Sequence, residues 1–227
     1  MKMNMNKEYM AMLKFSVYEN SKEYKNIRKI VFAMYMTDRK YFMRKEDVAN
    51  AYDDVALPIG YNQTISQPTT VARMISMLDL KKKQDVLEIG SGSGWNAAVI
   101  AYMIYPGKVT SIERIKGLYE FAVSNFFKFI EERKIKKLKV DFVFADALNK
   151  KEKFWKKKYD RIITTAMVSG GLSGKIKEMG AELLKEKGLL LFPYKEGLEL
   201  WEKENKKLSR IGREEGYVFV PLLKGKE

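Results

Sequence analysis

The sequence predicts an α/β protein with a doubly wound, mostly parallel sheet, a helical N-terminal cap and antiparallel strands near the C-terminus. From Asp85 onward, short apolar runs alternate with stretches of helical period, which is the pattern of βαβ units. The last apolar runs are joined by short connections, which favours antiparallel pairing. The length of 227 residues fits one domain, in which residues 1–50 form the cap and residues 51–227 form the cofactor- and substrate-binding core.

The individual elements follow from periodicity and from Gly and Pro signals. Residues 1–50 have apolar side chains at helical spacing, and we expect the methionines among them to fill the core. Residues 57–68 are expected to form a loop. The expected strands are 85–89, 108–113, 138–144, 161–165, 189–192, 198–201 and 217–223, and the expected helices after residue 90 are 95–105, 116–132 and about 175–184.

The composition excludes several kinds of chemistry. The chain contains no cysteine and no histidine. Disulfides, thiolate metal sites, cysteine nucleophiles, the usual zinc ligands and an imidazole general base are therefore excluded, and we expect no bound metal. The reaction should need little base catalysis.

The net charge of +14 could indicate a polyanion partner such as a nucleic acid. Lysine-rich clusters at 81–83, 134–139 and 150–158 each precede an expected strand, which puts them at the edge of a parallel sheet opposite the ligand site. We therefore favour a solvated surface over a nucleic-acid site. No segment resembles a secretory signal or a membrane span, and we expect a cytoplasmic protein.

The strongest local signal is the run Val86-Leu87-Glu88-Ile89-Gly90-Ser91-Gly92-Ser93-Gly94, in which an apolar strand enters a glycine turn that opens a helix. Glycines let the backbone approach a ligand closely. Trp95 replaces the third glycine of a dinucleotide fingerprint, and no Walker lysine follows. Glu88 would repel a pyrophosphate but suits the ammonium group of a methionine moiety. The turn therefore indicates S-adenosylmethionine.

Acids also end the next two expected strands. Glu113 lies 25 residues after Glu88, where its carboxylate can accept hydrogen bonds from both ribose hydroxyls. Asp146, flanked by Ala145 and Ala147, can bind the adenine amino group. One such acid alone could be a turn cap, but three after a glycine turn form a specific set. They predict the Rossmann-like sheet of class I S-adenosylmethionine-dependent methyltransferases, with a cofactor site made of Glu88, Gly90, Ser91, Gly92, Glu113, Asp146 and Ala147.

Several motifs resemble the protein-L-isoaspartate (D-aspartate) O-methyltransferase family. They are Leu57-Pro-Ile-Gly-Tyr-Asn-Gln-Thr-Ile-Ser-Gln-Pro68, Gly-Trp-Asn-Ala-Ala at 94–98, Ile112-Glu-Arg114 and Val218-Phe-Val-Pro-Leu222. They occur in the family's order and span the chain from about Tyr41 onward. Taken alone, Ser66 could instead be a plain helix N-cap before Pro68.

The resemblance implies methylation of the free carboxylate of isoaspartyl residues in damaged proteins, by a monomeric enzyme without metal. It implies that Ser66 is the catalytic residue that binds the substrate carboxylate, that Thr64 and Ile65 shape the pocket, and that the backbone near Val218 holds the peptide. A carboxylate is already ionised at neutral pH and can attack the sulfonium methyl without a general base. The family's ester then cyclises to a succinimide, which reopens partly to aspartate.

Three departures from the family's pattern put the substrate in more doubt than the cofactor. Thr69 stands where relatives often have histidine, and Ala145 and Ala147 flank the third-strand acid in place of glycines. The loop 165–171 lacks the Ala-rich, proline-containing turn. Two alternatives therefore stay open, an RNA methyltransferase on the same fold and a non-catalytic relative. The absence of an Asn-Pro-Pro-Tyr-like motif after the fourth strand speaks against the first.

Overall fold

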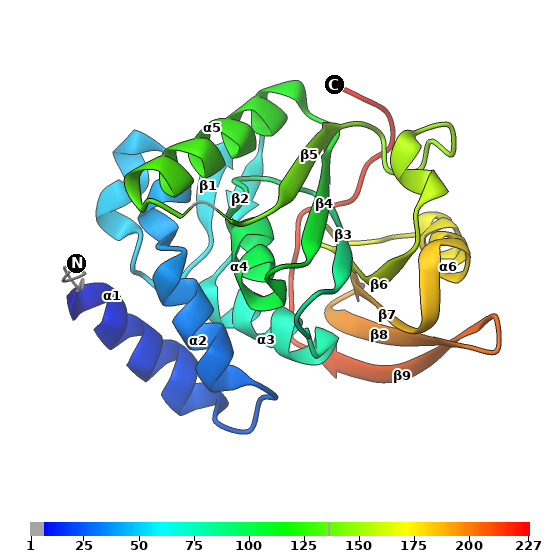
Figure 1. Cartoon of the computed structure of the whole chain (residues 1–227), viewed down its shortest axis with the longest axis horizontal. Coiled ribbons are helices and arrows are strands. Elements are labelled where there is room, and N and C mark those ends of the chain that lie inside the picture. The colour runs from blue at the N-terminus through cyan, green and yellow to red at the C-terminus, as the bar shows by residue number, and fades with distance from the viewer. Residues whose placement is uncertain (1–6, 136) are drawn as a thin grey trace.

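A sheet of seven strands organises the computed structural model, which describes residues 7–135 and 137–227, without the side chain of Asn20 (Figure 1). The strand order is β5-β4-β3-β6-β7-β8-β9. Five neighbouring strands, from β5 to β7, pair in parallel, and β8 and β9 continue the sheet antiparallel. The predicted α/β fold class is confirmed. The strands are β3 (Asp85–Ile89), β4 (Lys108–Glu113), β5 (Val140–Phe144), β6 (Tyr159–Thr164), β7 (Leu184–Tyr194), β8 (Gly197–Glu204) and β9 (Lys207–Glu215).

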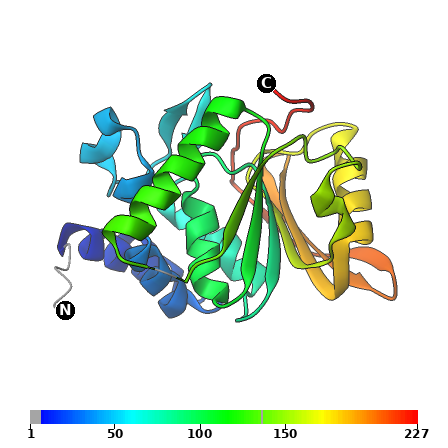
Figure 2. The ribbon, with the colours of Figure 1, turned by 45° about the horizontal axis from the view of Figure 1, so that its top comes forward.

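Helices cover both faces of this sheet. In Figure 2, α4 and α5 lie on one side of the strands, and α6 lies on the other. The core helices are α3 (Pro68–Leu78), α4 (Trp95–Ile104), α5 (Lys116–Glu132), η5 (Lys153–Lys156) and α6 (Leu172–Leu183). The segment before them is helical over most of its described length, with α1 (Lys7–Met12), the π-helix η1 (Leu13–Tyr18), η2 (Glu19–Ser21), α2 (Ile27–Met36), η3 (Arg39–Phe42) and η4 (Lys45–Asn50). Residues 1–6 of the predicted cap lie outside the described residues.

The strands alternate their side chains between two apolar clusters, one on each face. Val86 packs with α2 to α5, whereas its neighbour Leu87 packs with α6. In β7, Leu189 and Leu191 face the first cluster, and Leu190 faces the second. This period of two, with both faces apolar, is why the sequence runs are continuously hydrophobic.

Two predictions near the ends of the core were wrong. The expected loop at 57–68 contains a hairpin of β1 (Leu57–Gly60) and β2 (Gln63–Ile65). Its turn residues Tyr61 and Asn62 both have positive φ, the conformation of a tight hairpin turn. The expected strand 217–223 is not a strand and has only an isolated bridge from Pro221 to Met167. The last strand is β9, an exposed edge whose polar sequence carries little apolar signal.

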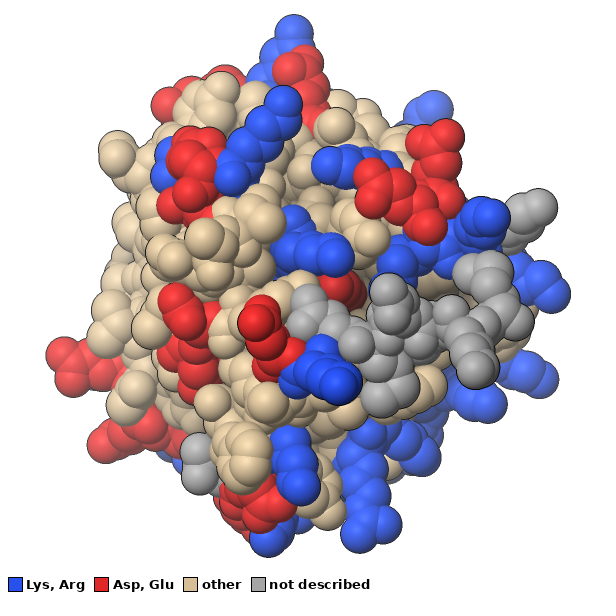
Figure 3. All heavy atoms as spheres, turned by 90° about the vertical axis from the view of Figure 1, so that its left-hand side faces the viewer, with Lys and Arg blue, Asp and Glu red and all other residues tan. Residues whose placement is uncertain are grey.

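The lysine-rich clusters precede β3, β5 and β6 in the chain. Two of them, 81–83 and the described part of 134–139, lie at the amino ends of β3 and β5, but 150–158 begins near the carboxyl end of β5, where the Trp155 indole donates to the Ala147 carbonyl at 3.0 Å. On the face seen in Figure 3, basic side chains gather toward one side and acidic side chains are interspersed among them. Within the described residues, no helix is both long and apolar enough to cross a membrane.

Candidate active site

A cleft opens at the carboxyl ends of β3, β4, β5 and β6, beside the point where the strand order reverses. Ligands bind at this position in open α/β sheets. The cleft holds about 900 Å³ of empty space, its open mouth included. Its walls come from the hairpin β1–β2, the turn after β3, the ends of β4 to β6 and the segment 220–223.

The glycine turn after β3 is fixed to the neighbouring strand by its backbone. The amides of Gly90 and Ser91 both donate to the carbonyl of Ile112, at 2.8 and 3.1 Å. Gly90 has φ +97°, and a Cβ there would collide with the Thr165 hydroxyl. Thr165 donates to the Gly90 carbonyl at 2.7 Å, so glycine is required both for the turn and for this contact.

Glu113 ends β4 on the cleft wall, as predicted. Its side chain accepts hydrogen bonds from the amides of Gly92 at 3.0 Å, Arg114 at 2.9 Å and Ile115 at 3.1 Å. These donors hold the carboxylate in one orientation at the rim of the glycine turn. Oε1 accepts two of these bonds and Oε2 accepts one, so about one of the four acceptor sites of the carboxylate, on Oε2, is left for a ligand hydroxyl.

Glu88 lies behind the cleft wall, not on it. The residue is fully buried, and its carboxylate accepts from Ser111 at 2.5 Å and from Asn96 at 2.7 Å. Burial raises the pKa of Glu88 to about 7, against the opposing effect of these two hydrogen bonds. Asn96 does line the cleft. The predicted contact of Glu88 with a ligand ammonium therefore stays a prediction, and the structure adds a role in holding the turn.

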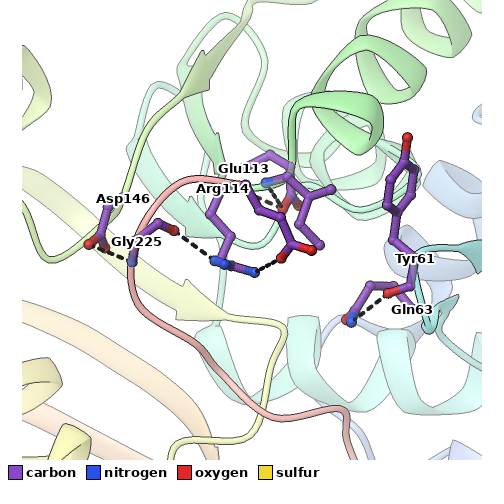
Figure 4. Close-up of polar contacts among 8 residues, drawn as sticks. Tyr61, Gln63, Glu113, Arg114, Asp146 and Gly225 are labelled. Carbon is purple, nitrogen blue, oxygen red and sulfur yellow. Dashed lines mark hydrogen bonds and ion pairs between the residues drawn. The ribbon is translucent and has the colours of Figure 1, made fainter.

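Asp146 lies just after β5, between Ala145 and Ala147, which both line the cleft. One of its oxygens accepts from the Leu148 amide and the other from the Gly225 amide, each at 2.9 Å. The chain end thus reaches the acid predicted to bind adenine (Figure 4).

Arg114 holds this same chain end against β4. Its Nε donates to the Gly225 carbonyl at 2.7 Å, and its guanidinium pairs with the Glu227 carboxylate at 3.0 Å. The Glu227 amide donates to the Arg114 carbonyl at 2.9 Å, and the Lys116 amide donates to the Glu227 carbonyl at 2.8 Å. Residues 225–227, called here the C-terminal tail, therefore cross the ends of β4 and β5.

The hairpin forms the opposite wall with Gln63, Thr64, Ile65 and Ser66, so the three predicted substrate residues at 64–66 do line the cleft. α3 begins at Pro68 with Gln67 as its N-cap, so Ser66 does not cap the helix. Among the described residues, the Ser66 hydroxyl has no hydrogen-bond partner and is available to a ligand.

The hairpin tip is held near the start of α5. A Cβ on Gly117 would collide with the Tyr61 ring, so the glycine lets the ring lie against the helix backbone. Figure 4 shows Tyr61 and Gln63 on the hairpin, across the cleft from Glu113, with the Tyr61 ring pointing toward α5. The Gln63 amide donates to the Tyr61 carbonyl at 3.2 Å.

The C-terminal segment 217–223 runs along the cleft mouth, but Val218 itself is 87% exposed and lies outside the cleft lining. Val220 and Pro221 do line it. Met167 ties the segment to the loop 165–171, because its amide donates to the Val220 carbonyl at 2.7 Å and its carbonyl accepts from Leu222 at 2.8 Å.

Several residues in the cleft wall or directly behind it were not predicted from the sequence. Ser111 joins Glu88 to Ser91, whose hydroxyl lies 2.7 Å from that of Ser111. Its polar side chain inside an apolar strand was the available signal. Asn96 and Thr165 carry no such signal, because a polar residue in the first turn of a helix or after a strand is ordinary.

The model of the protein-L-isoaspartate(D-aspartate) O-methyltransferase family matches residues 12–227. The chain belongs to this family. The protein-L-isoaspartate O-methyltransferase of Thermosipho melanesiensis is 36% identical over 211 residues, which cover 91% of this chain and all of that protein. That of Methanothrix thermoacetophila is 35% identical and covers 93% of this chain and 95% of its own length.

A solved structure of the Plasmodium falciparum protein described as a protein-L-isoaspartate O-methyltransferase, in complex with S-adenosyl-L-homocysteine, shares the fold. Its TM-score is 0.78 at 22% identity, covering 96% of this chain and all of that one. The structure also shows the contacts of the residues at which this chain departs from the family's pattern. The Thr69 amide and hydroxyl donate to Asp54 at 3.0 and 3.1 Å, and Ala145 and Ala147 are buried in the cleft wall.

Proposed function

We propose that this chain transfers the methyl group of S-adenosylmethionine to the free carboxylate of isoaspartyl residues in damaged proteins and peptides. The observation that carries the proposal is a family match over residues 12–227 on a chain whose cleft joins the glycine turn and Glu113 on one side to Ser66 on the other. Family membership alone would not supply the geometry, and the geometry alone would fit many methyl acceptors.

The donor side of the cleft is defined here as the turn 90–94, Glu113 and residues 145–147. The residues there fit S-adenosylmethionine. Glu113 is oriented by three amides with acceptor capacity left for one ribose hydroxyl, and Gly90 and Gly92 let the backbone approach the ligand. Ala147 and Asp146 would face the adenine. Glu88 would act on the methionine end through Asn96, which lines the cleft and donates to the Glu88 carboxylate.

The substrate side is defined as residues 63–66, the loop 165–171 and the segment 217–223. Ser66 would donate its hydroxyl to one oxygen of the isoaspartyl carboxylate, and Thr64 and Ile65 would shape the pocket beside the methyl group. The exposed backbone around Val218 would hold the peptide at the cleft mouth.

In this reaction the protein mainly has to place the substrate carboxylate in line with the methyl group. When bound, S-adenosylmethionine would supply an electrophilic methyl group to the carboxylate oxygen, and the products would be S-adenosylhomocysteine and a methyl ester. The attacking oxygen is already anionic at neutral pH, which agrees with a chain that has no histidine. Ser66 would orient this oxygen, and Ile65, which is 3% exposed, would exclude water.

Methyl transfer from radiolabelled S-adenosylmethionine to an isoaspartyl peptide tests the proposal, with the matched aspartyl peptide as control. Base-labile label on the isoaspartyl peptide alone is the expected result. Label on neither peptide, with donor binding intact, would contradict it. A parallel reaction with bulk tRNA then separates an RNA methyltransferase from a relative without turnover.

A further inference from the structure

Arg39, at the start of η3, is fully buried and lies far along the chain from the cleft residues. Its guanidinium donates four hydrogen bonds to backbone carbonyls. Nη1 donates to Ala51 at 3.2 Å and Asp53 at 3.1 Å, and Nη2 donates to Val55 at 2.8 Å and Ser66 at 3.1 Å. One side chain thus connects the segment 51–55 to the proposed catalytic serine through hydrogen bonds to their carbonyls.

The guanidinium remains charged in this buried place. Burial lowers the pKa of Arg39 to about 10, which is still well above neutral pH. The guanidinium lies over the Trp95 ring, 5.4 Å from its centroid. Trp95 lines the cleft, and its indole donates to the Thr37 carbonyl at 2.9 Å. A rigid, charged fork therefore lies between the N-terminal cap and the cleft.

A second anchor fixes the chain on the other side of Ser66. The half-buried Asp54 carboxylate accepts from the Gln67 amide side chain at 3.1 Å, and from the Thr69 amide and hydroxyl at 3.0 and 3.1 Å. Asp54 belongs to the segment 51–55, whose carbonyls accept hydrogen bonds from Arg39. Ser66 is thereby held through its own carbonyl and through the residues that follow it.

We propose that Arg39 is a positioning residue for Ser66, setting the place of its hydroxyl in the cleft through the Ser66 carbonyl and the 51–55 segment. The inference rests on the proposed function and goes beyond it, because Arg39 touches neither the donor side nor the cleft space. A lysine cannot replace it, since one ammonium cannot reproduce the planar fork that reaches four carbonyls.

Arg39→Lys tests this, with Arg161→Lys as the matched control. Arg161 is also buried, and its guanidinium donates to the carbonyls of Leu78 at 2.6 Å and Asp160 at 2.8 Å, outside the cleft lining. We expect Arg39→Lys to lower kcat for an isoaspartyl peptide about threefold to tenfold, because a residue that acts through the Ser66 hydroxyl can cost no more than the loss of that hydroxyl. S-adenosylhomocysteine affinity should stay within about twofold. Arg161→Lys should lower the unfolding midpoint but leave kcat unchanged.

Two further measurements keep the test decisive if Arg39→Lys folds poorly. Asp54→Asn weakens the second anchor at a half-buried position and should lower kcat in the same direction. In the Ser66→Ala background, Arg39→Lys should cost much less kcat than it does in the wild type, because the two residues act through one hydroxyl. Equal losses in both backgrounds, or equal kcat losses for Arg39→Lys and Arg161→Lys, would overturn the inference.

Hydrogen exchange separates this inference from the proposed function. If the wild type fails to methylate isoaspartyl peptides, the proposed function fails. Faster exchange of residues 51–69 in Arg39→Lys, and not in Arg161→Lys, would still support the anchoring role. Unchanged exchange there would overturn the inference even in an active enzyme.

Discussion

The two sides of the cleft are built by different means. The donor side is held by backbone hydrogen bonds between neighbouring strands and the turn that follows them, such as those from Gly90 and Ser91 to Ile112. The substrate side is held by side chains from distant segments, chiefly Arg39 and Asp54, and by the pairing of Met167 with the C-terminal segment. The donor side should therefore tolerate few backbone changes, and the substrate side should depend on its remote anchors.

Two glycines with nearly the same backbone conformation give the largest expected contrast. Gly90 has φ +97° and Gly60 has φ +94°, but only at Gly90 would a Cβ meet Thr165, whereas nothing lies within 4 Å at Gly60. We expect Gly90→Ala to lower the free energy of unfolding by about 3 to 4 kcal/mol, from strain plus the lost Thr165 contact, and to abolish donor binding. Gly60→Ala should cost about 1 to 2 kcal/mol from strain alone. Urea unfolding and calorimetric titration with S-adenosylhomocysteine measure both. Equal costs for the two substitutions would contradict the expected contribution of the Thr165 contact.

The raised pKa of Glu88, behind the donor side, should make the free energy of unfolding depend on pH. Burial raises the pKa of Glu88 to about 7, with the nearby Glu113 charge adding to the rise. The native state therefore binds more protons than the unfolded state between about pH 4.5 and 7, so the contribution of Glu88 to stability falls as pH rises through that window. Glu88→Gln should be more stable than the wild type at pH 8 by up to about 3 kcal/mol and similar at pH 4.5.

The urea midpoints of wild type and Glu88→Gln at several pH values measure this effect, since every other group titrates in both proteins. A constant difference between the two proteins from pH 4.5 to 8 would show that Glu88 does not titrate there.

The same contrast explains what the sequence could predict. The glycine turn, Glu113 and Asp146 follow apolar strands directly, so local pattern was enough to place them at one sheet edge. The sequence pattern predicts a loop instead of the hairpin at 57–65, because the hairpin strands are only four and three residues long. Its turn uses Tyr61 and Asn62 where glycine is the usual signal.

Other features depend on tertiary contacts that no local pattern carries. The expected strand at 217–223 failed because its apolar residues pack along the cleft mouth without a partner strand, and β9 was missed because its alternation is polar. Arg39 is one of 43 basic residues, and nothing near it in the chain marks it as buried. Remote anchors of this kind become visible only in the fold.

Glu113→Ala and Ser66→Ala should separate the two sides by function. Glu113→Ala removes the acceptor for a ribose hydroxyl and should weaken donor binding about a hundredfold, the loss of one charge-assisted hydrogen bond. Ser66→Ala should leave donor affinity within about twofold and lower kcat by about tenfold. Donor affinity comes from calorimetry and kcat from methyl transfer to the isoaspartyl peptide. Equal donor affinities in the wild type and Glu113→Ala would show that Glu113 does not bind the ribose of the donor.

The smallest expected effect concerns the C-terminal tail, which lies on the donor side and is held by the Arg114 and Asp146 side chains together with backbone hydrogen bonds of Glu227. The Gly225 amide donates to Asp146, so an adenine amino group that uses the same oxygen must replace this bond. Truncation after Lys224 removes one hydrogen bond that donor binding would otherwise exchange, and such exchanges are worth about 1 kcal/mol or less. We expect donor affinity to change by less than about fivefold, while association and dissociation both become faster because the tail no longer crosses β4 and β5.

Stopped-flow binding measures both rates, with Glu227→Gln as the milder control, because it weakens only the exposed pair with Arg114. Unchanged rates after truncation would mean that the tail lies beside the path of the donor, whereas a loss of affinity beyond tenfold would make the tail a part of the binding site.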